Sequence, residues 1–325
     1  MASRLSQILE ECPGASISGE EISRRLGTTR AAVWKQVQSL RAKGYEIVGT
    51  RGEGYRLLRR PDLINAEALE ARFGRKPIWT AFEYFPVTDS TNARAMELAE
   101  KGAPHATIVC ADAQTSGRGR LGRKWESPPG INLYLTVILR PPIEPYRAPQ
   151  LTLMTAIALA QAVEETTGLA CALKWPNDLY IGGRKAAGIL AEMAADPDRL
   201  RHVAVGIGLN VNGLEKDFPE EIRGKATSLR IQAGRSFARV DILAEFLTRL
   251  SEAYHTFLAG GFAALRPEWT RRALIDGKRV LLRQRGDAEW GTALGVDEEG
   301  VLMFRKDGDA SIGKIYSGEI IEFEG

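Results

Sequence analysis

Cysteine and histidine are scarce, with only three of each among the 325 residues. The cysteines are odd in number, far apart and without CxxC spacing, which argues against a disulfide framework and against a zinc knuckle. No two histidines stand at metal-ligand spacing. We therefore expect a protein of a reducing compartment whose chemistry runs without a metal cage. The six residues are Cys12, Cys110, Cys171, His105, His202 and His255.

Long hydrophobic runs are also missing. The most apolar run, from Leu151 to Val163, is interrupted by Thr152, Thr155 and Gln161, whereas a membrane helix needs about 18 uninterrupted apolar residues. The N-terminal stretch MASRLSQILEEC carries acidic residues where a signal peptide requires an apolar segment. These absences predict a soluble, cytoplasmic protein that makes no membrane contact.

The composition is that of a folded protein, with 44% apolar and 26% charged residues. At about 100–200 residues per domain, the length predicts two or three domains. Residues 1–60 hold nine Arg and two Lys against six Glu, a net charge of +5, while the rest of the chain carries −2. A basic module before a near-neutral body suggests nucleic-acid contact at one end. An uneven solvated surface remains the alternative.

The basic segment has the pattern of a helix-turn-helix. Residues 1–11 have the apolar spacing of an amphipathic helix. Ser18 and Glu21 form a capping-box pattern that opens a second helix through Leu26, and Gly27 ends it. A third helix, capped by Thr28 or Thr29 and ending at Gly44, then follows the tight glycine turn. Its inner face is expected to carry Val33, Val37 and Leu40.

Two strands, residues 45–48 and 55–58, should form a wing after the third helix. Polar and basic side chains on the outer face of that helix and at the tip of the wing can reach bases or phosphates. This cluster favours DNA binding over a winged helix used only for dimerisation or packing. The predicted DNA-binding residues are Thr29, Arg30, Lys35, Gln36, Gln38 and Arg51.

Residues 59–62, RRPD, indicate a domain boundary, because Pro61 disfavours helix in the residue before it. Strands and helices are mixed from residue 63 to about 274, and hairpins outnumber βαβ crossovers. The sheet should therefore be largely antiparallel with helices on one face, an α+β domain. The expected strands are residues 81–85, 107–111, 132–139, 172–175, 179–181, 185–192 and 202–212, and the expected helices are 92–101, 149–166 and 241–259.

The strongest functional signal is the loop at residues 114–125, QTSGRGRLGRKW. It matches GxGxxG formally, but no helix can open at the following WESPPG, and no acidic residue stands about 20 residues on to hold a ribose. It also lacks the Gly-Lys-Ser/Thr of a P-loop. Four cations and three glycines suit a backbone that closes around carboxylate or phosphate oxygens. A small anionic ligand is therefore favoured over a solvated nucleic-acid loop.

Three further segments carry candidate site residues. Ser90-Thr91-Asn92 offers hydroxyls, an amide and backbone N–H groups at a helix start, although these residues could simply cap the helix. Lys174 lies in an otherwise apolar strand, where an inward ammonium would need an anion; a solvent-facing lysine is the alternative. Residues 206–212, GIGLNVN, place glycines on one face of a strand, which indicates close approach of a ligand or another backbone.

In this order and spacing, the glycine–arginine loop, KWPND at 174–178, KAAGILAE at 185–192 and GIGLNVN resemble the biotin–protein ligases. With the N-terminal winged helix, the chain is similar to the bifunctional subgroup that also represses biotin-synthesis genes. The resemblance covers essentially the whole chain. It implies an α+β multidomain fold: a winged helix-turn-helix at 1–60, a class II aminoacyl-tRNA-synthetase-like (biotin/lipoate ligase) domain at 63–274, and an SH3-like β-barrel at 276–325.

The four strands expected in the SH3-like barrel are residues 280–282, 290–296, 301–305 and 312–315. The resemblance also implies a two-step reaction. Biotin and ATP, with its accompanying Mg²⁺, form biotinyl-5′-adenylate and pyrophosphate, and the biotinyl group then passes to a lysine of a biotin carboxyl carrier protein. Operator DNA and a homodimer formed on adenylate binding are the further implied partners.

Residue roles follow from the same resemblance. Ser90, Thr91, Asn92 and Gln114 would bind the ureido group or line its pocket, and residues 118–120 would fold over the ligand. Residues 216–229 correspond to the adenylate-side loop of the family. The expected catalytic residues are Arg118, Arg120 and Lys174. The expected biotin and adenylate contacts are Ser90, Thr91, Asn92, Gln114, Gly117, Arg118, Gly119, Arg120, Trp125, Lys174, Asn177, Gly188, Gly206, Gly208 and Asn210.

Two alternatives remain open from the sequence. One is a ligand-sensing DNA-binding regulator whose ligase domain is catalytically inactive; the presence of Arg118, Arg120 and Lys174 favours the active enzyme. The other is a lipoate ligase, the nearest chemical competitor, which shares the fold type but is not expected to carry the Gly-Arg-Gly-Arg loop in this form.

Overall fold

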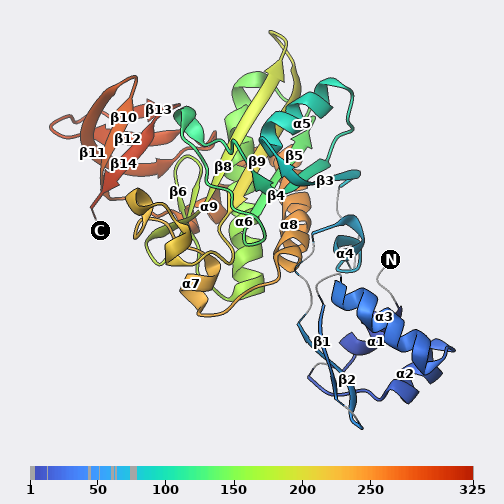
Figure 1. Ribbon diagram of the computed structural model, residues 1–325. Helices are drawn as coiled ribbons and strands as arrows, with labels where there is room; N and C mark the ends of the chain where they lie inside the picture. The colour runs from blue at the N-terminus through green and yellow to red at the C-terminus, as the bar shows by residue number, and fades with distance from the viewer. Residues whose placement is uncertain are drawn as a thin grey trace. The chain divides into compact units, whose positions relative to one another are not determined.

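The computed structural model describes residues 4–12, 14–42, 45–50, 52–59, 62, 64–73 and 79–324. The chain divides into two compact units, Met1–Ala71 and Arg72–Gly325 (Figure 1). The boundary expected at 60–63 thus lies before the last helix of the first unit. The segment 276–325 groups with the central domain, and its separate domain status stays a prediction. None of the described helices combines the length and apolarity needed to cross a bilayer.

The described residues of the first unit form three helices, a two-stranded hairpin and a short fourth helix. Its elements are α1 (Arg4–Glu10), α2 (Gly19–Leu26), α3 (Arg30–Ala42), β1 (Glu46–Thr50), β2 (Gly54–Arg59) and α4 (Ala66–Glu70). Strands β1 and β2 pair antiparallel, as expected for a wing. The helix-turn-helix and the wing predicted from the sequence are therefore both present.

The turn between α2 and α3 follows the predicted capping residues. Ser18 Oγ accepts a hydrogen bond from Glu21 N at 3.1 Å, and Gly27 ends α2 in the left-handed conformation with φ 61°. Only the Ser18 half of the expected capping box is present, because the Glu21 carboxylate pairs with Arg24 and Arg25 instead. Thr29 caps α3 by accepting from Ala32 N at 3.2 Å.

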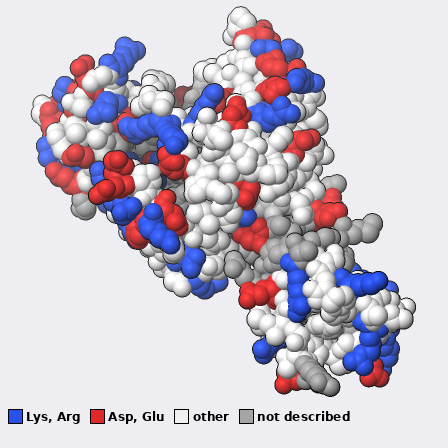
Figure 2. Space-filling model, in the orientation of Figure 1, with Lys and Arg blue, Asp and Glu red and all other residues white. Residues whose placement is uncertain are grey.

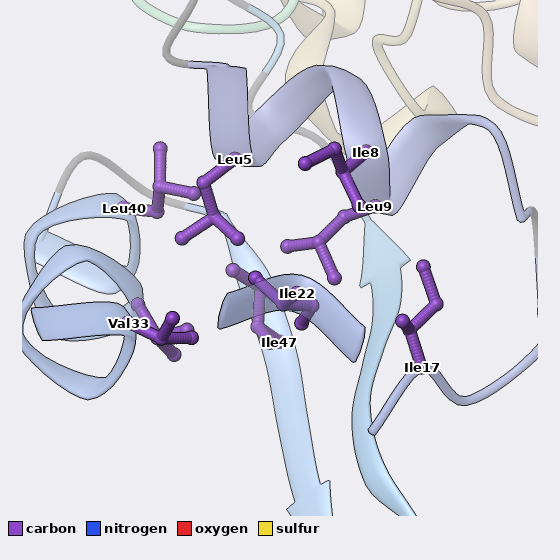
Figure 3. Close-up of a cluster of buried hydrophobic side chains, with 9 residues drawn as sticks. Leu5, Ile8, Leu9, Ile17, Ile22, Val33, Leu40 and Ile47 are labelled. Carbon is purple, nitrogen blue, oxygen red and sulfur yellow. The ribbon is translucent and has the colours of Figure 1, made fainter. Parts of the chain in front are cut away.

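A single apolar cluster holds this unit together (Figure 3). The predicted inner stripe of α3 is confirmed, because its three members are between 0% and 4% exposed. They pack against one face each of α1 and α2 and against the wing. Since burial of such side chains is the main favourable term in folding, the cluster fixes α3 with its opposite face toward solvent. The cluster consists of Leu5, Ile8, Leu9, Ile17, Ile22, Val33, Val37, Leu40 and Ile47.

The second unit is built on a seven-stranded sheet of order β3-β4-β5-β9-β8-β7-β6. Strands β3 and β4 run parallel, and the other neighbouring pairs run antiparallel, which confirms the predicted largely antiparallel sheet. The elements up to residue 272 are β3 (Ala81–Thr88), α5 (Thr91–Glu100), β4 (Thr107–Gln114), β5 (Leu133–Leu139), α6 (Ala148–Thr167), β6 (Ala172–Lys174), β7 (Asp178–Ile181), β8 (Arg184–Ala195), β9 (Leu200–Leu209), α7 (Leu229–Ala233), α8 (Arg239–Gly260) and α9 (Arg266–Arg272).

Helices cover both faces of this sheet, so the expectation of helices on one face is wrong. Helix α5 packs on the face that carries Val109, Ile138 and Ala204. The alternate residues of β9, from Val203 to Leu209, are buried on the other face. Helix α6, against which α8 packs, covers that face (Figure 1). The first face therefore stays partly open beside α5, and the candidate site lies there.

A second sheet, of five antiparallel strands in the order β13-β12-β11-β10-β14, forms the C-terminal part. The four strands expected from the sequence are present, and β14 was not expected. The buried face of this sheet includes Val280, Leu282, Phe304 and Ile320, as the small-barrel prediction requires. The strands are β10 (Arg279–Gln284), β11 (Asp287–Val296), β12 (Leu302–Lys306), β13 (Gly313–Ile315) and β14 (Glu319–Phe323).

Two histidines near the end of α5 have imidazoles whose pKa is lowered by their surroundings. His202 is 2% exposed, and His105 Nδ1 accepts a hydrogen bond from Arg140 N at 3.0 Å. Burial and the neighbouring Arg140 guanidinium lower the pKa of both imidazoles. The Glu100 carboxylate, 3.7 Å from His202 Nε2, opposes this shift without reversing it.

We expect the free energy of unfolding to fall as the pH drops below about 6.5, the ordinary histidine value. Below this pH the two histidines bind protons more readily in the unfolded chain than in the folded one. The free energy of unfolding is therefore highest above pH 6.5 and falls as the pH drops from 6.5 to the lower pKa of the folded state. The loss is at most about 1.4 kcal/mol per histidine for each pH unit. Urea unfolding at pH 7.5 and 5.5 measures it. His202→Gln should flatten the dependence; an unchanged slope in this variant would contradict the assignment.

Candidate functional site

A cavity of about 330 Å³ lies in the second unit. Fourteen of the fifteen residues predicted to contact biotin or the adenylate line it. They are Ser90, Thr91, Asn92, Gln114, Arg118, Gly119, Arg120, Trp125, Lys174, Asn177, Gly188, Gly206, Gly208 and Asn210. The exception is Gly117. A Cβ there would stand 2.4 Å from Trp125 O, so backbone packing explains this glycine.

The start of α5 forms one polar wall of the cavity. Ser90 is the N-cap and accepts from Ala93 N at 3.5 Å. Gln114 Oε1, at the end of β4, accepts from Thr91 N at 2.8 Å, and its Nε2 donates to Ser127 Oγ at 2.9 Å. The capping role that the sequence left as an alternative is therefore real for Ser90. The hydroxyl of Thr91 and the amide of Gln114 are held in place by their partners.

Asn92 is fixed by protein groups on both sides of its amide. Its Nδ2 donates to Leu190 O at 3.1 Å and to Glu192 Oε2 at 2.8 Å, while its Oδ1 accepts from Thr136 Oγ1 at 2.7 Å. A Cβ on Gly206 would stand 2.0 Å from Asn92 Oδ1. Gly206 is thus required by a neighbouring side chain. Asn92 has little free hydrogen-bonding capacity and is suited to position the wall.

Trp125 lies across the glycine pair Gly188 and Gly208 on this face of the sheet. Gly188 and Gly208 are direct partners in the β8–β9 register. A Cβ on Gly208 would stand 2.4 Å from the indole Nε1, and one on Gly188 would stand 3.2 Å from Cζ3. The close approach predicted for GIGLNVN is present: the side chain of Asn92 lies against Gly206, and the side chain of Trp125 lies against Gly208.

The glycine–arginine loop is a compact hairpin. Gly119 N donates to Arg123 O at 2.7 Å and Trp125 N donates to Gly117 O at 2.9 Å. Leu121, at its tip, has φ 57° and is 72% exposed, a left-handed conformation that is uncommon outside glycine. The loop follows β4 and bears side chains on the cavity, as a ligand-covering segment requires.

Charge on this loop is mostly compensated. Arg118 lies 3.7 Å from Glu192 and Lys124 lies 2.8 Å from Glu126, while both Nη atoms of Arg123 donate to the Glu319 carboxylate. Arg120 differs. Its Nη1 donates to Asn177 Oδ1 and its Nη2 to Gly318 O, both at 3.3 Å, and burial lowers the pKa of its guanidinium.

Lys174 is the second cation without a carboxylate partner at the site. It is 8% exposed, which settles the inward orientation over the solvent-facing one. Its Nζ donates to Tyr180 Oη at 3.3 Å and lies 5.9 Å from the centroid of the Phe323 ring. Within the described residues it forms no ion pair, and burial lowers the pKa of its ammonium. The Asp178 and Glu319 carboxylates oppose this shift without forming an ion pair with the ammonium. A buried ammonium without an ion-pair partner favours an anionic ligand, because the ligand would supply a direct counter-charge.

The far wall comes from the segment at 216–229. Asp217, Phe218, Ile222, Lys225 and Ala226 line the cavity. This wall is tied to the sheet: Asn210 Nδ2 donates to Thr227 O at 3.0 Å, and Leu229 N donates to Asn210 O at 3.1 Å. Asn210 is 5% exposed and therefore positions the wall.

Several lining residues were missed by sequence reasoning. Lys185 and Asp178 form an ion pair of 2.6 Å at the edge of the cavity, and Glu319 and Ile320 reach it from the start of β14. The only sequence signal for Lys185 and Asp178 was their presence in the quoted motifs. For Glu319 there was none, because it stands almost 200 residues after the loop arginine that it contacts.

The first unit presents the predicted DNA-binding side chains on α3. Thr29, Arg30 and Lys35 are exposed, and Gln36 and Gln38 are half-buried. Arg51 lies outside the described residues. Figure 2 shows Lys and Arg side chains at several places on the visible face of this unit. The candidate nucleic-acid surface is therefore the outer face of α3.

Known proteins resemble this chain in both the segment that forms the cavity and the segment that contains α3. The biotin/lipoate A/B protein ligase family matches residues 84–210, and an HTH domain matches residues 3–56. The chain is 40% identical over 318 residues to the bifunctional ligase/repressor BirA of Bacillus subtilis, covering 97% of each protein. It is 38% identical over 228 residues to the biotin–[acetyl-CoA-carboxylase] ligase of Paracoccus denitrificans, covering 67% of this chain and 91% of that protein.

A solved structure gives the same result. The biotin protein ligase from Aquifex aeolicus, in complex with biotin and ATP, has a TM-score of 0.64 and 33% sequence identity, over 76% of this chain and 98% of that one. The relative from Bacillus subtilis spans the HTH segment as well as the ligase segment. The chain therefore belongs to the biotin/lipoate A/B protein ligase family, among the bifunctional ligase/repressors that join an HTH domain to the ligase domain.

Proposed function

We propose that the cavity binds biotin and Mg–ATP, forms biotinyl-5′-adenylate, and passes the biotinyl group to a lysine of a biotin carboxyl carrier protein. The observation that carries the proposal is a pair of cations on one cavity that form no ion pair with a carboxylate of the described residues, the buried Lys174 and the half-buried Arg120. Two anions, a carboxylate and a triphosphate, must meet for adenylation. Positioned cations offset their repulsion, so catalysis is mostly positioning and electrostatic stabilisation.

In the first step, the biotin carboxylate oxygen attacks the α-phosphorus and pyrophosphate leaves. Lys174 would stand between the carboxylate and the α-phosphate, because its ammonium is the buried charge at this wall. Arg118 and Arg120 would donate to phosphate oxygens from the loop. The polar wall of Thr91 and Gln114 would bind the ureido ring, and the segment at 216–229 would lie beside the adenosine.

In the second step, the amine of an acceptor lysine attacks the mixed anhydride and AMP leaves. The hairpin loop covers the cavity and would keep the adenylate from water until an acceptor arrives. The acceptor class is supported by the Paracoccus denitrificans relative, whose name specifies acetyl-CoA carboxylase. The curated relatives with an HTH segment and a ligase segment are bacterial, and in bacteria both Mg–ATP and genomic DNA lie in the cytoplasm, so we propose that the protein works there.

Two assays test the ligase. Biotin-dependent pyrophosphate release from Mg–ATP reports adenylation, and mass spectrometry of an acceptor domain incubated with the protein, ATP and biotin reports transfer. Release without transfer would contradict the carrier-protein step. If neither reaction occurs, the alternative of a ligand-sensing regulator with an inactive ligase domain is favoured. Activity with lipoate in place of biotin would indicate a lipoate ligase.

For DNA, we propose that two copies of the chain bind an inverted-repeat operator when the adenylate is present. One winged helix neutralises few phosphates and binds weakly at physiological salt, whereas two at a fixed spacing multiply the effective affinity. Ordering of residues 117–124 over the adenylate changes the surface of the ligase domain and can thereby favour a homodimer.

Adenylate should raise operator affinity and shift sedimentation from monomer to dimer. Gel-shift and sedimentation measurements with and without biotin and ATP check both effects. Deletion of residues 1–60 should abolish DNA binding while the remaining chain still adenylates biotin. Equal operator affinity in both conditions would contradict the coupling even if the ligase activity were present.

The Arg123–Glu319 ion pair predicts coupling between the loop and β14. Both Nη atoms of Arg123 donate to the Glu319 carboxylate, and the distance from Nη2 of Arg123 to Oε2 of Glu319 is 2.8 Å. The Glu319 side chain is only 18% exposed. Arg123→Ala and Glu319→Gln should each raise the KM for ATP by about fivefold, because a bidentate, partly screened pair contributes about 1 kcal/mol. The double variant should be no worse than either single one; additive losses would show that the two side chains act separately.

A further inference from the structure

Trp34 stands in the middle of the candidate DNA surface and was not among the predicted DNA-binding residues. It is 54% exposed, the largest fraction among the large apolar side chains described in the first unit. Its neighbour Val33 is fully buried, as is Val37 one turn on, so the packing of α3 holds Trp34 on the outer face. A lone exposed apolar side chain needs no explanation in itself, but its surroundings here are specific.

Cations and amides surround this indole. Arg30, Trp34 and Gln38 recur every four residues and therefore form one row along α3, with Lys35 exposed beside it. Helix α3 contains no acidic residue. Among the described residues, no carboxylate pairs with Arg30 or Lys35. The row is thus positive with one apolar centre.

The indole N–H has a partner within the helix. With its amide oriented so that the oxygen faces the two donors, Gln38 accepts from Trp34 Nε1 at 3.3 Å and from Arg41 Nη1 at 3.1 Å. The indole ring can therefore be desolvated without leaving its N–H unpaired. An unpaired buried N–H would reduce the binding free energy. The same contact restricts the side chain before any partner arrives, which reduces the entropy lost on binding.

We propose that Trp34 reads a thymine in the major groove by packing its indole on the 5-methyl group. The thymine methyl is the apolar group that base edges present in that groove. The second helix of a helix-turn-helix contacts base edges through its N-terminal residues, and Trp34 is the fifth residue of α3. Arg30 and Lys35 flank it with charge for the phosphates. This inference rests on the proposed DNA binding.

The test compares duplexes that differ by single methyl groups. Full-length protein with biotin and Mg–ATP selects its preferred duplex from a randomised library, and each thymine of that duplex is then replaced by deoxyuridine. For the wild type, one thymine per half-site should be sensitive. Loss of the methyl should weaken binding by about fourfold, the effect of exposing one buried methylene-sized group.

Three variants separate methyl recognition from general affinity. Trp34→Ala should lose about tenfold for the selected duplex and become insensitive to deoxyuridine, while Trp34→Phe should retain part of that sensitivity. Lys35→Ala is the matched comparison on the same helix. It should weaken all sequences alike and reduce the salt dependence, as expected of a phosphate contact. Because Trp34 is exposed, thermal unfolding should show that each variant is folded.

The outcomes distinguish the two levels of the proposal. A wild type that enriches no sequence overturns DNA recognition and the role of Trp34 with it. A wild type that selects a duplex while Trp34→Ala binds it equally well overturns only the role of Trp34. Methyl sensitivity that survives in Trp34→Ala, or a wild type insensitive to every deoxyuridine, overturns the methyl contact.

Discussion

Biotin-dependent pyrophosphate release should fall by about a thousandfold when Lys174 is changed to alanine or methionine. One cation about 4 Å from a charge contributes on the order of 4 kcal/mol at an effective dielectric near 20, and each 1.36 kcal/mol is a factor of ten in rate. Lys174 is the buried ammonium of the cavity, and no salt bridge joins it to a carboxylate of the described residues, although the Asp178 and Glu319 carboxylates oppose the lowering of its pKa by burial. Its charge is therefore available to the reacting anions.

Stability should change in the opposite sense. Burial of this ammonium costs desolvation free energy in the ligand-free protein, and the same burial lowers its pKa. Lys174→Met keeps about the same side-chain volume and removes that desolvation cost. We expect the unfolding temperature of Lys174→Met to equal or exceed that of the wild type. Lys101→Ala, a change at an exposed ion pair on α5, is the control and should alter neither quantity. Near-normal adenylation by Lys174→Met would show that this lysine does not meet the reacting phosphate.

The sequence predicted well what depends on short-range pattern. The strand with Lys174, the strands at 179–181 and 185–192 that flank a hairpin turn at Gly182 and Gly183, and the caps of α2 and α3 all rest on residues within a few positions of one another. In the structure both glycines of that hairpin have positive φ, 56° and 74°, as a tight turn requires. The short helices α4, α7 and α9 lack a clear apolar periodicity and were missed, whereas the equally short α1 was predicted from its apolar spacing.

Long-range partners were not predictable in the same way. A glycine in a strand indicates that something lies close, but the sequence does not say what, and the groups proved to be the side chains of Asn92 and Trp125. Likewise the loop arginines invite an anion, yet Arg123 already holds Glu319 from β14. These contacts join segments about 80 to 200 residues apart, where only tertiary packing decides the pairing.

Arg120 gives the second large expected effect, on retention of the intermediate. Its guanidinium joins the loop to Asn177, which follows β6, and to the backbone of Gly318, which precedes β14. Hydrogen bonds from a charged donor contribute about 1.5–3 kcal/mol each. Loss of two therefore favours the open loop by about 3 kcal/mol, or about a hundredfold in population, taking the lower figure because both bonds are long. Glycine at this position adds backbone freedom to the open state.

An open loop releases a reactive mixed anhydride into solution. Arg120→Gly should therefore biotinylate an unrelated protein such as serum albumin, in proportion to time and to exposed lysines, while the wild type labels the acceptor domain alone. Arg120→Ala separates the lost guanidinium from the added freedom and should show most of the effect. Anti-biotin blotting and mass spectrometry measure the label, and pyrophosphate release measures how much adenylate each variant forms, so that the label can be compared per adenylate made. Acceptor-only labelling by both variants, with adenylation intact, would mean that the contacts of Arg120 with Asn177 and Gly318 do not retain the intermediate.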